Sequence, residues 1–189
     1  MSSILLTGPA VEPLSLAEAK AFLRVDSGDD DDLIAALIVS ARTFVEAQTR
    51  RALITQTWRL IRDAWPDDAR IRVVPAPLQA LVAVRTYDSD GAAQAIDTTV
   101  FVADLGAAVL AFPPWSLPAP GRLTAGIELD VRVGYGDAAA NVPEPLRLAI
   151  RALVAHWYEN RGLVALNATV AELPAGVAAL IAPYRVLSL

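Results

Sequence analysis

The feature that most constrains the fold is the spacing of apolar residues, which changes twice along the chain. Across residues 12–54 apolar residues recur every three to four positions, the spacing of a helix that buries one face. Across residues 55–136 they alternate with polar residues, as in half-buried strands, and helical spacing returns across residues 142–183. We therefore predict an α+β fold for a single domain of 189 residues. In it, a small helical bundle from both ends of the chain carries an inserted, mostly antiparallel β unit.

The two N-terminal helices are indicated by their start signals. Ser15 and Glu18 have the spacing of a capping box and predict a helix over residues 16–24. The predicted core face of this helix comprises Leu16, Ala19, Phe22 and Leu23. The acidic run at residues 29–32 precedes a second helix that reaches about residue 51, because carboxylates favour a helix N-terminus. A calcium loop is the alternative. It requires Glu at its twelfth position, and the twelfth residue counted from Asp26 is Leu37, so the helix start is preferred.

The C-terminal helices are marked by proline. With Pro143 as its first residue, a third helix places both Pro143 and Pro145 in its first turn, where a missing amide is tolerated. Its core face is predicted to comprise Leu146, Ile150, Leu153 and Trp157. A last short helix is predicted from Pro174 to Pro183.

The middle of the chain predicts strands at residues 57–62, 70–73, 81–87 and 127–135, with hairpins at residues 88–91 and 100–112. Before the last strand lies a stiff loop that contains Pro113, Pro114, Pro118 and Pro120 and carries Trp115. Trp115 either anchors a partner or covers the open face of its own sheet, and the sequence leaves both interpretations open.

Composition excludes several kinds of catalytic site. The chain has no cysteine and one histidine, so disulfides, thiolate zinc sites and a cysteine nucleophile are ruled out. His156 lies in a predicted helix without a nucleophile-elbow motif, and no glycine-rich phosphate loop is present. Carboxylates such as Asp88 and Asp130 lie in turns or on polar strand faces, where solvation explains them. We therefore predict no enzyme activity, no cofactor and no metal site.

Charge and hydropathy point toward protein partners. A net charge of −5 argues against tight non-specific binding to DNA. The chain is 54% hydrophobic, which is high for a monomer, so it either crosses a membrane or buries surface against other proteins. Its longest uncharged stretch, residues 105–121, contains four prolines, and its N-terminus lacks the basic region of a signal peptide. We expect a soluble intracellular chain with large interfaces and no membrane association.

Motifs along nearly the whole chain resemble the head-tail connector, or adaptor, proteins of long-tailed phages. The resemblance is carried in the N-terminal half by LSLAEAKAFLRVD at residues 14–26, the acidic run, and ARTFVE to RALITQTW across residues 41–58. In the C-terminal half it is carried, in the same order as in the family, by VGYG at 133–136, Val142-Pro143, LVAHWYENR at 153–161, LPAGV at 173–177 and PYR at 183–185.

The resemblance implies a structural virion protein without catalytic residues. Such a protein forms a ring, usually of twelve copies, under the portal protein at the capsid vertex. The ring extends the DNA channel, through which DNA passes without specific binding, and it provides the platform for the stopper or tail. The implied location is the neck between capsid and tail, after assembly in the bacterial cytoplasm. Gene transfer agents carry similar proteins, and the sequence does not separate them from phages.

Contact residues are expected in two places. We predict that the C-terminal tail contacts the portal through Tyr184, Arg185, Leu187 and Leu189, and that Trp115 contacts a neighbouring subunit or the tail side.

Other functions remain as alternatives. A tail-completion or stopper protein would bind the adaptor ring instead of the portal. A ligand-binding β module would need aromatic residues grouped on one exposed sheet face, whereas Trp58, Tyr87 and Tyr135 occupy alternating positions typical of a core. A carboxylate-based hydrolase would depend on Asp88 or Asp130.

Overall fold

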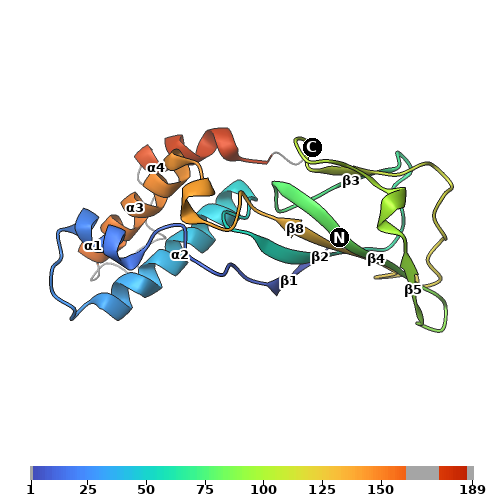
Figure 1. The fold of residues 1–189 in the computed structure, drawn as a ribbon, viewed down its shortest axis with the longest axis horizontal. Coiled ribbons are helices and arrows are strands. Elements are labelled where there is room, and N and C mark those ends of the chain that lie inside the picture. The colour runs from blue at the N-terminus through green and yellow to red at the C-terminus, as the bar shows by residue number, and fades with distance from the viewer. Residues whose placement is uncertain (1, 161–174, 187–189) are drawn as a thin grey trace. The chain divides into compact units, whose positions relative to one another are not determined.

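A computed structural model describes residues 2–160 and 175–186. The chain divides into two compact units. One unit comprises Met1–Ala10 and Thr55–Tyr135 and contains the strands; the other comprises Val11–Ile54 and Gly136–Leu189 and contains the α-helices. The predicted α+β class is confirmed (Figure 1).

The helical unit is built from both ends of the chain, so that the blue and orange-red helices of Figure 1 pack together. Its helices are α1 (Leu16–Leu23), α2 (Asp31–Thr49), α3 (Glu144–Glu159) and α4 (Ala175–Ile181), with short 3-10 turns η2 (Ala139–Asn141) and η3 (Ala182–Tyr184). Helices α2 and α3 each contact the other three α-helices, so these two form the centre of the described part of this unit. The residues buried in this core recur at helical spacing: Ile34, Ile38, Ala41 and Val45 in α2, Leu146, Ile150 and Leu153 in α3, and Val177 and Ile181 in α4.

Two residues expected in this core lie closer to solvent. Phe22 is exposed, because the eight-residue helix α1 buries only Ala19. Trp157 is half-buried and packs edge-on against Phe44, with ring centroids 6.1 Å apart. Both helices therefore bury a narrower face than their apolar residues predict.

The helix starts follow the sequence signals. The Ser15 hydroxyl accepts a hydrogen bond from the Glu18 amide at 3.2 Å, and the Glu18 carboxylate accepts one from the Ser15 amide at 2.9 Å, which confirms the capping box. The acidic run does begin α2, but the Asp30 side chain makes no capping bond to the helix backbone. It accepts a hydrogen bond from the Tyr158 hydroxyl at 2.5 Å instead, and so ties the start of α2 to the end of α3.

The β unit contains two antiparallel sheets. The larger has five strands in the order β1 (Ser2–Thr7), β2 (Gln56–Arg62), β8 (Ile127–Val133), β4 (Leu78–Tyr87) and β5 (Ala93–Ile96). The smaller has three strands in the order β3 (Arg70–Arg72), β7 (Val109–Ala111) and β6 (Val102–Asp104), and a 3-10 turn, η1 (Thr98–Val100), precedes β6. All pairs among the described strands are antiparallel, as predicted.

Strand β1 was not predicted from the sequence. Its residues, SSILLT, lack polar-apolar alternation, and all six are exposed in the structure. A strand without a buried face has no reason to alternate, so the period-two signal is missing.

The central strand β8 is the most buried of the larger sheet, with Ile127, Leu129, Val131 and Val133 inaccessible to solvent. Trp58, Tyr87 and Tyr135, expected to be core residues, are each half-buried. A second apolar cluster, made by Trp65, Phe101 and Phe112, has ring centroids 5.4 to 6.1 Å apart. Among the described residues no helix is both long and apolar enough to cross a membrane.

Candidate interaction surfaces

The beginning of the C-terminal tail is bound to the end of α2. That helix stops at Arg50, which adopts a left-handed conformation with φ of 55°, and its last carbonyl groups lack partners inside the helix. The tail supplies one, since the Val186 amide donates to the Thr49 carbonyl at 2.9 Å. In return Arg51 Nε donates to the Tyr184 carbonyl at 2.6 Å. The first part of the tail is therefore held by its backbone.

Two of the predicted tail residues, Tyr184 and Arg185, lie within the described residues. Arg185 is exposed and donates a hydrogen bond to Gln48 Oε1 at 3.1 Å, and Tyr184 is half-buried. Together with Arg50 and Arg51 at the end of α2, Arg185 makes this part of the surface basic in a chain of net charge −5. Leu187 and Leu189 lie outside the described residues.

Trp115 is presented to solvent by a strained turn. Its side chain is 99% exposed, so it covers none of its own sheet and that interpretation is wrong. Its φ is 66°, a left-handed conformation that costs a non-glycine residue about 1–2 kcal/mol. The turn is closed by Ser116, whose amide and hydroxyl donate to the Pro113 carbonyl at 3.2 and 2.7 Å.

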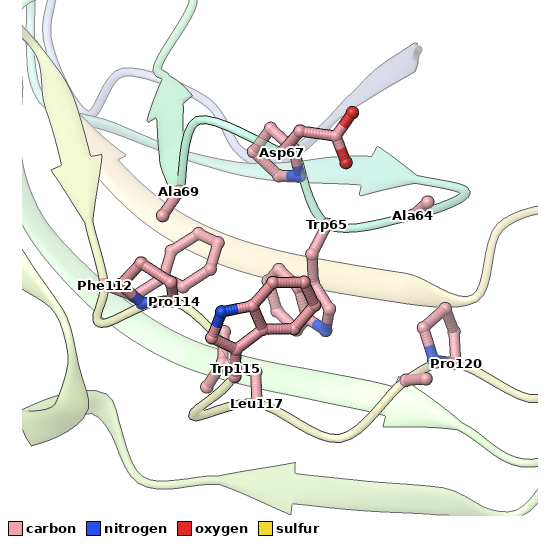
Figure 2. A pocket seen from close by; sticks show the side chains of 11 residues that line it. Ala64, Trp65, Asp67, Ala69, Phe112, Pro114, Trp115, Leu117 and Pro120 are labelled. Atoms are coloured by element: carbon pink, nitrogen blue, oxygen red, sulfur yellow. The ribbon is translucent and has the colours of Figure 1, made fainter.

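A pocket of about 510 Å³ lies beside this turn. Figure 2 shows Trp115 with Trp65, from the segment after β2, and Phe112, from the end of β7. The lining is mainly apolar and comprises Ala64, Trp65, Pro66, Asp67, Ala69, Phe112, Pro114, Trp115, Leu117, Ala119 and Pro120. Trp65 Nε1 donates to the Pro118 carbonyl at 2.8 Å, which fixes the proline loop over the aromatic cluster.

The far end of the same loop is also fixed. The Gly121 amide donates to the Tyr87 carbonyl at 2.8 Å, and a Cβ at this glycine would lie 2.3 Å from the Ser89 amide nitrogen. The Arg122 guanidinium lies over the Tyr87 ring, 4.3 Å from its centroid. Directly after these attachments the chain exposes Leu123 as well, at 95%. A loop held at both ends presents its apolar residues at little entropic cost to binding.

Part of this surface could be predicted from the sequence. Trp115 was singled out, whereas Trp65, Phe112 and Leu123 were not. The signal that could have found the first two is the pairing of aromatic residue and proline, Trp65-Pro66 and Phe112-Pro113, at the ends of predicted strands.

An ionic network occupies one face of the larger sheet. Asp130 on β8 is 6% exposed and accepts hydrogen bonds from Arg59 of β2 at 2.7 and 3.0 Å and from Arg85 of β4 at 3.0 Å. These two guanidinium groups hold the pKa of the Asp130 carboxyl below its ordinary value, Arg59 through the larger effect. The same arginines pair with Glu128 at 3.2 and 3.5 Å.

The carboxylates considered for hydrolysis therefore have structural roles. Asp130 is neutralised by two arginines, and Asp88 Oδ1 accepts the amides of Asp90 and Ala92 at 3.0 and 2.8 Å, which closes the turn before β5. His156 is half-buried in α3, and its Nδ1 lies 3.4 Å from Nδ2 of Asn160. Within the described ranges, no group of three or more His, Cys, Asp or Glu side chains could hold a metal ion.

Comparison with known proteins finds similarity to a family of phage proteins. Residues 13–101 match the family model described as phage gp6-like head-tail connector protein. No curated protein matches the chain.

Solved structures match over the full length. A chain from the neck of an empty gene transfer agent (GTA) particle, computed with C6 symmetry, has a TM-score of 0.83 and 25% identity, covering 100% of this chain and 97% of the other. A chain from the neck of a native GTA particle, computed with C12 symmetry, has a TM-score of 0.80 and 25% identity with the same coverage. A chain from the virion of a native GTA particle has a TM-score of 0.81 and 24% identity, again with that coverage.

Proposed function

We infer that this chain, whose residues 13–101 belong to the phage gp6-like head-tail connector family, is a structural connector of the neck between capsid and tail. The observation that carries this inference is the fold. Its helical and β units together match a GTA neck chain over 100% of the present chain at a TM-score of 0.83. The structural roles of Asp88 and Asp130 agree with a function that involves no catalysis.

Within the neck, we propose a ring of twelve copies. The GTA neck structures that contain similar chains were computed with C6 and C12 symmetry. A ring subunit must present two different surfaces that fit each other, and so it exposes more apolar area than a monomer needs. Exposed apolar side chains such as Phe22, Val39 and Val82 and the 54% hydrophobic composition support this proposal.

The portal is the proposed partner of the C-terminal tail. Tyr184 and Arg185 lie on a segment that is held by its backbone. Arg185 is exposed and Tyr184 is half-buried, so both side chains offer surface for a contact. Leu187 and Leu189 follow directly in sequence and complete the proposed contact. The basic end of α2 around Arg50 and Arg51 favours an acidic surface on the portal.

Trp115 is the proposed contact with a neighbouring subunit or with the tail side of the neck. A strained, exposed tryptophan on a loop that is fixed at both ends resembles a preformed binding anchor, because tryptophan is enriched among the residues that dominate binding.

A charge reversal in the tail tests the portal contact. We expect Arg185→Glu to weaken binding to the cognate portal at least tenfold in a surface-immobilised binding assay, since it places repulsion where the acidic portal surface is proposed. Arg132→Glu is the matched control, because Arg132 is also exposed but lies on β8. Equal affinities for the two variants would refute the tail contact. Binding to an adaptor ring but not to the portal would identify a stopper instead.

A further inference from the structure

Within the part of the chain that the structure describes, the larger sheet has an unprotected edge at β1. The strand contains no charged residue, proline or glycine, and all six residues are exposed. Ile4, Leu5 and Leu6 are 50%, 45% and 43% exposed, and because successive side chains point to opposite faces, both faces of this edge are apolar. Proteins usually protect such edges with charges, prolines or a covering segment, since free backbone groups there accept another strand.

The pairing of β1 with β2 contains one irregularity, and most of β1 lies outside it. The register with β2 shifts between Leu5 and Thr7, whereas Ser2 to Leu5 pair regularly with Ile61 to Trp58. Four consecutive residues of β1 therefore present a straight edge.

The opposite edge of the sheet matches this one in length and polarity. Strand β5 has four residues, Ala93, Gln94, Ala95 and Ile96, none of them charged, and the first three are exposed. Its small alanine side chains leave room beside it for the larger side chains of Ile4 and Leu5. Neither edge carries a charge that would repel the other.

The direction of the strands fits a ring. Each of the five strands is antiparallel to its neighbour, so β1 and β5, the first and fifth in the sheet, run in the same direction. A small rotation about a ring axis nearly preserves strand direction from one copy to the next. The β5 edge of a second copy would thus run parallel to β1, and parallel strands pair with evenly spaced hydrogen bonds.

We propose that β1 of one copy pairs with β5 of the next copy, so that the five-stranded sheets join edge to edge around the ring. The proposal rests on the ring assembly proposed above. A second copy is the occupant that the structure favours, because the two edges match each other and occur once in every subunit. Such a contact between two different surfaces is heterologous, the type that closes into a ring.

Cross-linking can test this directly, because the chain has no native cysteine. The test uses the full chain, assembled alone or on its cognate portal, with the double variant Ile4→Cys/Ala95→Cys and a short bis-maleimide reagent. We expect a ladder of covalent multimers. Each single variant should give no ladder, since one cysteine per copy cannot link a heterologous contact into a chain. The matched control is Ile4→Cys/Leu123→Cys, which carries its second cysteine on the exposed proline loop and should also give no ladder.

The outcomes separate this inference from the proposed function. A ladder restricted to the Ile4/Ala95 pair supports edge pairing. Dimers from Ile4→Cys alone would indicate pairing of β1 with β1 and would overturn it. Multimers of ring mass by light scattering without a ladder would also overturn it while leaving the ring intact. Failure of the unsubstituted protein to assemble on the portal would instead remove the connector function.

Discussion

Asp130 is the residue whose charge most directly links the three central strands β2, β8 and β4. It lies between Arg59 and Arg85, whose side chains are 26% and 31% exposed, so its pairing is only partly screened by water. We predict that Asp130→Asn lowers the free energy of unfolding by about 2 kcal/mol at pH 7, less than for a fully buried pair. Urea denaturation measures this. Asp137→Asn, at an exposed position, is the control and should change stability little.

The same residue predicts a pH dependence with a definite sign. The pKa of Asp130 is lowered in the folded protein, so its stabilising effect is fully present above its ordinary pKa of about 3.9 and is lost as the pH falls through the lowered value. The stability difference between the unsubstituted protein and Asp130→Asn should therefore shrink steadily below about pH 4. A difference that stays constant down to pH 2 would contradict the ion-pair explanation.

Trp115 predicts a separation of stability from assembly. Because its φ is positive, Trp115→Gly should be more stable than Trp115→Ala by about 1 kcal/mol, since glycine accepts this conformation without steric cost. Both variants should fold, because the side chain is fully exposed, and both should assemble less well. Thermal denaturation measures the stability of the two variants. Size-exclusion chromatography of each variant mixed with the portal measures its assembly. Unimpaired assembly of both variants would remove Trp115 from the interface.

At the scale of elements, the start of α1 depends on its cap. An eight-residue helix is too short to be stable alone, so it relies on Ser15, Glu18 and tertiary contacts. One such contact is Arg147 of α3, which binds Glu18 at 2.6 Å and the Pro13 carbonyl at 3.0 Å. We predict that Ser15→Ala costs about 1 kcal/mol in unfolding free energy. Ser40→Ala, on the exposed side of α2, is the control, and an equal loss there would show that the cap contributes nothing specific.

Elements with a buried face could be predicted from the sequence, and those without one could not. The strand β8 alternates because one of its faces is core, and α2 repeats at helical spacing for the same reason. Strand β1 buries neither face and escaped prediction, although it provides the edge used in the proposed ring contact. Phe22 was placed in the core because it is apolar, and its exposure arises from how little of α1 the bundle covers.

The candidate surfaces were predictable to a similar degree. Trp115 could be singled out because four prolines surround it, but its pocket requires Trp65, which lies fifty residues earlier in the chain. Only the folded β unit brings these residues together. The anchoring of Tyr184 to Arg51 spans a still longer separation, and neither residue signals it locally.

At the scale of the whole molecule, the net charge predicts behaviour toward DNA. Proteins bind DNA non-specifically when their cationic side chains displace counterions from the phosphates. A chain with a net charge of −5 is poorly suited to this, so the proposed ring should let DNA pass without retention. We predict no shift of duplex DNA by the assembled protein at about 0.15 M salt. Electrophoretic mobility or fluorescence anisotropy of the DNA measures this. Binding of the DNA to the assembled protein at micromolar concentration would contradict passage without retention.

The most direct test of the connector function is the mass of the complex that the purified chain forms with its cognate portal, measured by light scattering. Because a similar chain lies in a GTA neck that was computed with C12 symmetry, we predict about twelve copies on each portal ring, whether the protein is preassembled or forms a ring only on the portal. A chain that remains monomeric in the presence of the portal would contradict the connector function.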